Sequence, residues 1–278
     1  MKKINRRSFL AAAGLTAAAL ALTACGGSAS STASSTASSA ASSEAASTSA
    51  AAELTTDEAG KLTMATNAAF PPYEMTTDAG EFEGIDIDTA KAIAEKLGLE
   101  LQIDDMDFDA ALLSVQQGKA DIVMAGVTVT DERKAVMDFS DSYATGIQSI
   151  IVPEGSDITS PDDLAGKKIG TQRGTTGYIY CSDDFGDDAV VAYDDGLTAV
   201  QALNNGQVDA VVIDNAPAKE FVAANPGLVI LDTSYAEEDY AIGLAKGSAL
   251  EDAVNAALEE LKADGTLQSI VDKYITAE

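Results

Sequence analysis

Two arginines are the residues of this chain best suited to bind an anionic group. Arg133 and Arg173 are the only arginines after residue 24, and each follows a segment expected to form a strand. A guanidinium group is a planar fork that binds a carboxylate through two parallel hydrogen bonds, which lysine cannot copy. We expect Arg133 to clamp a carboxylate. The alternatives are an exposed ion pair with Asp131 or Glu132 for Arg133, and a solvated loop position for Arg173.

Asp214 is the matching candidate for binding a cation. It ends the apolar segment 210–213, where a carboxylate is costly unless it pairs with a cation or with the N–H groups of a helix N-terminus. A ligand ammonium group would satisfy it. Capping of a helix expected at 216–224 would also satisfy it, and the two roles can coexist.

Small and aromatic residues near these charges could complete a binding site. Gly126 suits a position where the backbone approaches a ligand closely, and Thr128 and Thr176 can donate hydroxyl and amide hydrogens. Phe70, Tyr73 and Phe108 could pack against a ligand side chain, although an aromatic residue is more often part of the core. All of these residues follow expected strands, and the carboxyl ends of parallel strands face ligand sites.

The composition excludes several classes of function. The chain contains no histidine, which excludes Ser-His-Asp hydrolases, Cys-His proteases and His-ligated zinc sites. After residue 24 it carries 13 basic and 45 acidic residues, a formal charge of −32. This charge repels nucleic acids and anionic lipids, so we expect no nucleic-acid partner.

A run of aspartates begins like a calcium-binding EF-hand loop. Counting from Asp105, however, the sixth residue is Ala110 and the twelfth is Gln116, where the motif requires glycine and glutamate. We therefore interpret the run as helix caps and surface, and we expect no metal and no other cofactor.

The first 24 residues have the pattern of a secretory signal peptide. Four basic residues among the first seven precede an apolar run at 9–23, which is too short to span a bilayer as a helix. The sequence Leu-Thr-Ala-Cys ending at Cys25 resembles a lipobox, after which cleavage leaves an acylated N-terminal cysteine. Arg6 and Arg7 also fit a twin-arginine signal, with a plain secretory signal as the alternative.

Residues 25–60 are expected to form a lipid-anchored, low-complexity tether. Between 26 and 52 the only charged residue is Glu44, and Ser, Ala, Thr and Gly make up almost all the rest. Such a segment cannot bury enough apolar surface to fold. The expected location is the cell surface, on the outer face of the cytoplasmic membrane, with membrane contact only through the lipid anchor.

The segment 61–124 is expected to alternate strands and helices in the order β-α-β-α-β, which indicates a parallel sheet with right-handed crossovers. Asp86 is the expected N-cap of the first helix and Gly98 its end, and Asp107 or Asp109 is expected to cap the second. The expected strands are 62–66, 99–103 and 121–124.

An internal repeat indicates two lobes of similar design. The segment 117–124 is echoed by 205–212, and 61–67 is echoed by 167–172. Strand-like segments at 149–152 and 240–245 would connect the lobes twice and form a hinge. The expected division is lobe 1 at 61–151 plus 236–278, and lobe 2 at 152–235.

Six short motifs together resemble the extracellular solute-binding proteins of polar amino-acid ABC transporters, the glutamine, histidine and arginine binders of family 3. The resemblance runs from about residue 61 to the C-terminus, and its motifs lie at 65–74, 84–88, 125–133, 138–140, 174–176 and 208–211. It implies an α/β fold of the two-lobed periplasmic-binding-protein-like II type, with two doubly wound sheets joined by a two-strand hinge. It also implies a monomer without enzymatic activity that binds an L-amino acid between its lobes and delivers it to a transporter permease.

The resemblance also implies a role for each candidate residue. Residues matching Arg133, Gly126, Thr128 and Thr176 bind the α-carboxylate in that family, and the one matching Asp214 binds the α-ammonium. The positions that border the side-chain pocket are Asn67, Phe70, Phe108 and Gln172. Two further motif residues, Ala125 and Thr175, are also expected in the ligand site.

Two departures from the family pattern bear on the ligand. Binders of cationic side chains often have aspartate at the position of Asn67, and the glutamine-type members have lysine near Gln172. Both departures remove a charge, so an uncharged polar side chain is favoured. The alternative functions are an enzyme resembling cyclohexadienyl dehydratases, which share this fold, and the ligand-sensing domain of a receptor.

Overall fold

The computed structural model describes residues 54–275. The expected signal peptide, Cys25 and most of the tether lie outside these residues. Within residues 54–275, no helix is both long and apolar enough to cross a membrane.

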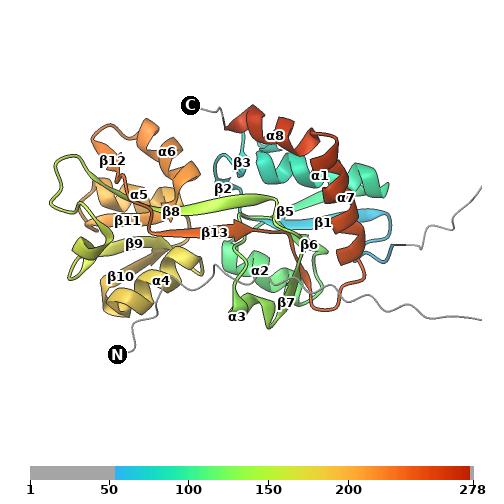
Figure 1. The fold of residues 1–278 in the computed structure, drawn as a ribbon, viewed down its shortest axis with the longest axis horizontal. Helices are drawn as coiled ribbons and strands as arrows, with labels where there is room; N and C mark the ends of the chain where they lie inside the picture. The colour runs from blue at the N-terminus through green and yellow to red at the C-terminus, as the bar shows by residue number, and fades with distance from the viewer. Residues whose placement is uncertain (1–53, 276–278) are drawn as a thin grey trace, which may run out of the picture. The chain divides into compact units, whose positions relative to one another are not determined.

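The described residues form two lobes, each built on a sheet with helices on both faces (Figure 1). We call the part built on the first sheet lobe 1. In this sheet β1, β5 and β6 are parallel, as the β-α-β-α-β pattern predicted, and β14 runs antiparallel to both β6 and β7. The strands in spatial order are β5 (Glu100–Asp105), β1 (Lys61–Thr66), β6 (Ile122–Val123), β14 (Gly243–Ala245) and β7 (Met137–Phe139).

The second sheet is the centre of lobe 2. Its strands β9, β10 and β11 are parallel, and β8 runs antiparallel to β11, β12 and β13. The path through the sheet is β10 (Val190–Tyr193), β9 (Ile169–Gln172), β11 (Ala210–Asp214), β8 (Ala144–Pro153) and β12 (Leu228–Ile230), with β13 (Ala236–Tyr240) on β8. A small third sheet contains β2 (Ala69–Phe70), β3 (Glu74–Thr76) and β4 (Phe82–Glu83).

Helices cover both faces of each large sheet. In lobe 1, α1, α7 and α8 pack together on one face and α2 covers the other; in lobe 2, α5 and α6 lie on one face and α4 on the other. Their bounds are α1 (Ile85–Leu97), α2 (Phe108–Gln116), α3 (Asp131–Lys134), α4 (Thr176–Phe185), α5 (Gly196–Asn204), α6 (Asn215–Ala224), α7 (Glu251–Ala263) and α8 (Thr266–Tyr274). Two short 3₁₀ turns, η1 (Pro161–Leu164) and η2 (Asp187–Ala189), complete lobe 2.

The N-terminus of α1 differs from the prediction made from the sequence. Gly98 ends α1 in the left-handed conformation, as predicted, but the N-cap of α1 is Gly84 and not Asp86. Asp86 lies inside the first turn and is fully buried. Asp107 occupies the N-cap position of α2 without a capping side-chain bond.

Strands β8 and β13 carry the chain between the lobes. They pair antiparallel from Ala144↔Tyr240 to Gln148↔Ala236, and the later part of β8 joins β11 and β12 in lobe 2. Figure 1 shows the two strands side by side along this crossing. Two adjacent crossings are the arrangement expected of a hinge.

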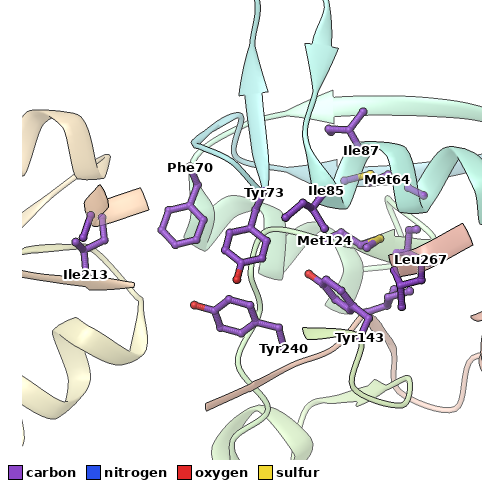
Figure 2. Packing of buried hydrophobic residues seen from close by; sticks show 14 of the residues in the cluster. Met64, Phe70, Tyr73, Ile85, Ile87, Met124, Tyr143, Ile213, Tyr240 and Leu267 are labelled. Atoms are coloured by element: carbon purple, nitrogen blue, oxygen red, sulfur yellow. The ribbon is translucent and has the colours of Figure 1, made fainter. Parts of the chain in front are cut away.

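An aromatic cluster lies next to the hinge. Figure 2 shows Phe70, Tyr73 and Tyr240 grouped on the lobe 1 side, with Ile213 on the lobe 2 side. The ring centroids of Phe70 and Tyr73 are 5.8 Å apart in a stacked arrangement, and those of Tyr73 and Tyr240 are 5.4 Å apart edge to face. All these side chains are buried.

Replacing Gly146 with alanine is expected to destabilise the hinge. A Cβ atom at position 146 would lie 2.6 Å from Cε1 of Tyr240, which is fully buried and cannot move freely. Overpacking of this kind costs about 1 to 3 kcal/mol of unfolding free energy. Thermal unfolding would measure the loss, and a melting temperature equal to that of the wild type would show that Tyr240 can move away.

Candidate functional site

A cavity between the lobes contains eleven of the residues that the sequence placed in a site, while Tyr73 and Arg173 are not part of its lining. Its volume is about 440 Å³ when the part open to solvent is included. The eleven expected residues in its lining are Asn67, Phe70, Phe108, Ala125, Gly126, Thr128, Arg133, Gln172, Thr175, Thr176 and Asp214. The lining also contains Glu74, Gln148, Val212, Ile213 and Tyr240.

Strand ends place most of these side chains. Asn67 follows β1, Gln172 ends β9, Asp214 ends β11, and the loop after β6 supplies Gly126 and Thr128. The carboxyl ends of parallel strands open toward the same edge of a sheet, and the two sheets present these edges to one cavity.

Arg133 is a buried cation with spare donors. Only 8% of it is exposed, its Nη1 donates to the Thr128 carbonyl at 2.8 Å, and its Nη2 donates to the Gly174 carbonyl in lobe 2 at 3.1 Å. Its guanidinium carbon lies 5.4 Å from the centre of the Phe108 ring. A guanidinium has five N–H groups, so three remain for a ligand.

Arg133 keeps its positive charge in this buried position. Burial lowers the pKa of Arg133 below its ordinary value, and Glu238 acts in the opposite direction. Arginine nevertheless stays protonated in proteins. An exposed ion pair with Asp131 or Glu132, the alternative left open by the sequence, does not describe this buried side chain.

Arg173 lies outside the cavity lining. Its side chain is 55% exposed, with Nη2 lying 3.6 Å from Asp194 and donating to the Ala192 carbonyl at 3.3 Å. The solvated loop position is therefore the correct interpretation for Arg173.

The N-terminus of α4 faces the same region as Arg133. Thr175 is its N-cap and accepts a hydrogen bond from the Tyr178 N–H at 3.3 Å. Thr175 and Thr176 both line the cavity. The first N–H groups of a helix have no partner within it and carry a partial positive charge, which favours an anion.

Asp214 caps α6 and also lines the cavity. Its Oδ1 accepts from the Ala216 N–H at 2.9 Å and caps α6, and its Oδ2 accepts from the Ile147 N–H of the hinge strand at 2.8 Å. It is buried and lines the cavity. Burial raises its pKa to about 6, although the two N–H groups act in the opposite direction.

Gly126 is fixed by a contact that the sequence did not indicate. Its N–H donates to Oδ2 of Asp86 at 3.0 Å, so it is not free to bind a carboxylate as the family resemblance implied. Its φ is 55°, and a Cβ atom would lie 2.9 Å from Cε1 of Phe70, so glycine is required. The carbonyl oxygen remains as its polar group.

Thr128 joins the lobes through a buried polar network. Its Oγ1 donates to Oε2 of Glu238 at 3.0 Å and lies 3.4 Å from Oγ1 of Thr176. Gln148 also donates to Oε2 of Glu238, at 3.0 Å. Glu238 and Gln148 stand on the two hinge strands, so the network connects the cavity wall to the hinge.

Amide groups meet at another wall of the cavity. Nε2 of Gln172 in lobe 2 donates to Oδ1 of Asn67 in lobe 1 at 2.8 Å. Nδ2 of Asn67 donates to the Met106 carbonyl at 2.9 Å. This wall carries no net charge from its two amides, as the sequence indicated.

Three polar residues of the lining were not assigned to the site from the sequence. Gln148 and Tyr240 lie on the hinge strands β8 and β13, whose inward faces the sequence pattern does not reveal. Glu74 ends the motif 65–74, which also contains Asn67 and Phe70. Its position in that motif was the available signal.

Two α/β lobes, a two-strand hinge and an interlobe cavity with a buried arginine and aspartate together define a solute-binding protein. Residues 62–277 match the bacterial extracellular solute-binding proteins, family 3, and the chain belongs to this family. The fold class expected from the sequence is confirmed.

Relatives named as binders of several amino acids are similar to the chain. A probable histidine-binding protein of Neisseria gonorrhoeae is 32% identical over 99% of this chain and 98% of its own length. The L-cystine-binding protein TcyJ of Escherichia coli K12 is 33% identical over 80% of this chain and 85% of its own. An ancestral arginine-binding protein bound to glutamine is 43% identical, with a TM-score of 0.75, over 78% of this chain and 99% of that structure.

Proposed function

We propose that this protein binds an L-amino acid with an uncharged polar side chain between its lobes and delivers it to the permease of an ABC importer. The observation that carries the proposal is that a buried cation, Arg133, and a buried acid, Asp214, both line the same cavity. An α-amino acid carries the complementary charges on neighbouring groups. The names of the relatives support an amino-acid ligand and do not agree on one side chain.

The carboxylate end of the ligand would lie against Arg133 and the start of α4. The spare guanidinium N–H groups supply charge-assisted hydrogen bonds, and the N-terminal N–H groups at Thr176 add a favourable dipole. Because Arg133 also bonds to Gly174 across the cleft, the same side chain favours the closed arrangement of the lobes.

The ammonium end would lie against Asp214, with the carbonyl oxygen of Gly126 as a second acceptor. Asp214 receives two backbone N–H bonds, and a carboxylate has about four lone-pair positions, so it can still accept from an ammonium group. Bonds to Arg133 in one lobe and Asp214 in the other would stabilise the closed state by differential affinity.

The side chain of the ligand would meet the amides of Asn67 and Gln172 and the rings of Phe70 and Phe108. Amides can donate to and accept from another amide or a hydroxyl group, whereas an ionic side chain would lose hydration without a counter-charge. This wall favours an uncharged polar side chain such as that of glutamine.

Two analogues of glutamine test the placement of its ends. Glutamine α-amide lacks the carboxylate and glutaramic acid lacks the ammonium, and each is expected to bind at least about a hundredfold more weakly than glutamine. Calorimetric titration measures all three. An analogue that binds as tightly as glutamine would remove the corresponding charge pair from the proposal.

Affinity is expected to fall as the pH drops below about 6. Burial raises the pKa of Asp214 to about 6, and an ammonium group binds the ionised form, so affinity should decrease by about tenfold for each pH unit below that pKa and stay constant above it. Titrations from about pH 4.5 to about pH 7.5 would show the slope. Asp214→Asn should lack it, and a flat wild-type profile would contradict the role of Asp214.

We also propose that Cys25 carries a lipid anchor and holds the protein on the outer face of the cytoplasmic membrane. The lipobox-like sequence ending at Cys25 supports this. Cys25→Ser is expected to shift the protein from the membrane pellet to the medium, and retention in the pellet would contradict the anchor.

The competing enzymatic function has a direct test. Glu74 is a buried carboxyl in the cavity lining, and a dehydratase would need a general acid or base at such a position. Incubation with prephenate or arogenate is expected to yield no aromatic product, and product formation abolished by Glu74→Gln would favour a dehydratase.

A further inference from the structure

We infer that Glu74 and Asp86 form a buried acid pair that shares one proton and positions Gly126 in the wall of the ligand cavity. Glu74 lines the cavity, and Asp86 lies behind Gly126 and accepts its N–H. Both residues are therefore positioning residues, acting on the ligand site through the backbone of Gly126.

The first observation is a set of buried oxygen atoms without donors. Glu74 and Asp86 are both 0% exposed. Among the described residues, both carboxyl oxygens of Glu74 and Oδ1 of Asp86 have no hydrogen-bond donor. Each carboxyl changes the pKa of the other, and the buried hydroxyl of Tyr143 also acts on Asp86. Two ionised carboxyls can only accept and a hydroxyl donates a single hydrogen, so a proton shared by the two carboxyls supplies a donor for the remaining oxygen atoms.

The backbone brings the two carboxyls together. Glu74 stands on β3, opposite Phe70 of β2, and the Asp86 N–H donates to the carbonyl of Tyr73 at 2.8 Å. Gly84 makes this approach possible, since a Cβ atom there would lie 2.9 Å from the Cα atom of Glu74. Main-chain contacts therefore fix the positions from which the two carboxyl side chains extend.

The surroundings favour a single negative charge on the pair. Burial and the neighbouring Asp86 raise the pKa of Glu74 well above 4.5. Burial raises the pKa of Asp86 to about 6, and the Gly126 N–H acts in the opposite direction. Glu74 is therefore the member of the pair that holds the proton more strongly, and Asp86 is the member that ionises more readily. The other titratable groups that act on the pair are Tyr73, Asp105, Tyr143 and Asp214, and no cation is among them in the described part of the chain.

The shared proton has a consequence for the ammonium end of the site, and this step rests on the proposed function. When Glu74 is neutral, Asp214 is the one carboxylate that faces the ammonium group. The positive charge of the ligand is then balanced by a single negative charge of the protein. The ionised Asp86 holds the Gly126 N–H, which fixes the loop and leaves the carbonyl oxygen for the ligand.

The test compares the unfolding of the wild type and Glu74→Gln without ligand, from about pH 5 to about pH 8. A raised folded-state pKa means that stability is full below the unfolded pKa, 4.5, and is lost as pH rises toward the folded pKa. Wild-type stability should fall relative to Glu74→Gln by about tenfold in the unfolding constant for each pH unit in that window. The glutamine amide donates to Asp86 at every pH and lacks this dependence.

Two controls keep the outcomes separate. Glu81→Gln, at an exposed position, should differ from the wild type by a constant amount over the same pH range. Infrared spectroscopy of the wild type at neutral pH should show the C=O band of a protonated carboxylic acid, which Glu74→Gln should lack. This spectrum decides the question even if the variant does not fold.

Ligand titrations then test the positioning role. Asp86→Ala should bind glutamine at least about tenfold more weakly than the wild type, because the Gly126 N–H loses its acceptor. A constant difference in unfolding together with no acid band would overturn the shared proton. If no amino acid bound even the wild type, the proposed function would fail while the unfolding and infrared results still decided the acid pair.

Discussion

Replacing Arg133 with alanine is expected to weaken amino-acid binding by at least about a hundredfold. Each charge-assisted hydrogen bond contributes about 1.5 to 3 kcal/mol, and a bidentate contact with a carboxylate makes two. Arg133 is 8% exposed, so water cannot readily replace the lost donors. Calorimetric titration of the variant with glutamine measures the change.

Arg173→Ala is the matched control for this prediction. Arg173 is the other arginine in the described residues, its side chain is 55% exposed, and it lies outside the cavity lining. Its removal should change affinity by less than about threefold. Arg133→Lys should also bind weakly, because lysine keeps the charge but lacks the fork. Unchanged binding in Arg133→Ala would refute the assignment of the carboxylate site.

Replacing Asp214 with asparagine is expected to weaken binding by about a hundredfold while leaving the fold intact. Asparagine caps a helix about as well as aspartate, so the bond from the Ala216 N–H and the start of α6 should persist. The substitution removes the negative charge that faces the ammonium group and also the bond from the Ile147 N–H, because the amide nitrogen of asparagine cannot accept it. Titration with glutamine and thermal unfolding of the same sample separate affinity from stability.

Asp214→Ala separates the two roles of this residue. It should lose a similar amount of affinity and, in addition, about 1 kcal/mol of stability from the missing cap. If Asp214→Asn bound glutamine as tightly as the wild type, Asp214 would be a helix cap only, and the ammonium group would have another partner.

The composition of the cavity lining was largely predictable from the sequence. Asp214 was identified because it ends an apolar segment, where a carboxylate is costly unless it has a partner. Arg133 and Thr176 were identified because the short motifs that contain them follow expected strands. The β-α-β-α-β order of the first 64 residues of lobe 1 followed from hydrophobic periodicity and glycine stops, and the parallel pairing of β1, β5 and β6 confirms it.

The role of Asp86 could not be predicted in the same way. An acidic residue just after a glycine at the start of a helix resembles an N-cap, and local sequence contains no sign that its partner is the N–H of Gly126, 40 residues away. Gln148 and Tyr240 pose the same difficulty, because which face of a hinge strand points into the cavity depends on the arrangement of both lobes. Tertiary contacts decide these positions.

The most direct test is calorimetric titration of the wild-type protein with each of the twenty amino acids and with cystine. We predict that an amino acid with an uncharged polar side chain, such as glutamine, binds most tightly, because the amides of Asn67 and Gln172 offer no counter-charge. Tightest binding of arginine, lysine, aspartate or glutamate would contradict the proposed side-chain preference, and no binding of any of them would contradict the proposed function itself.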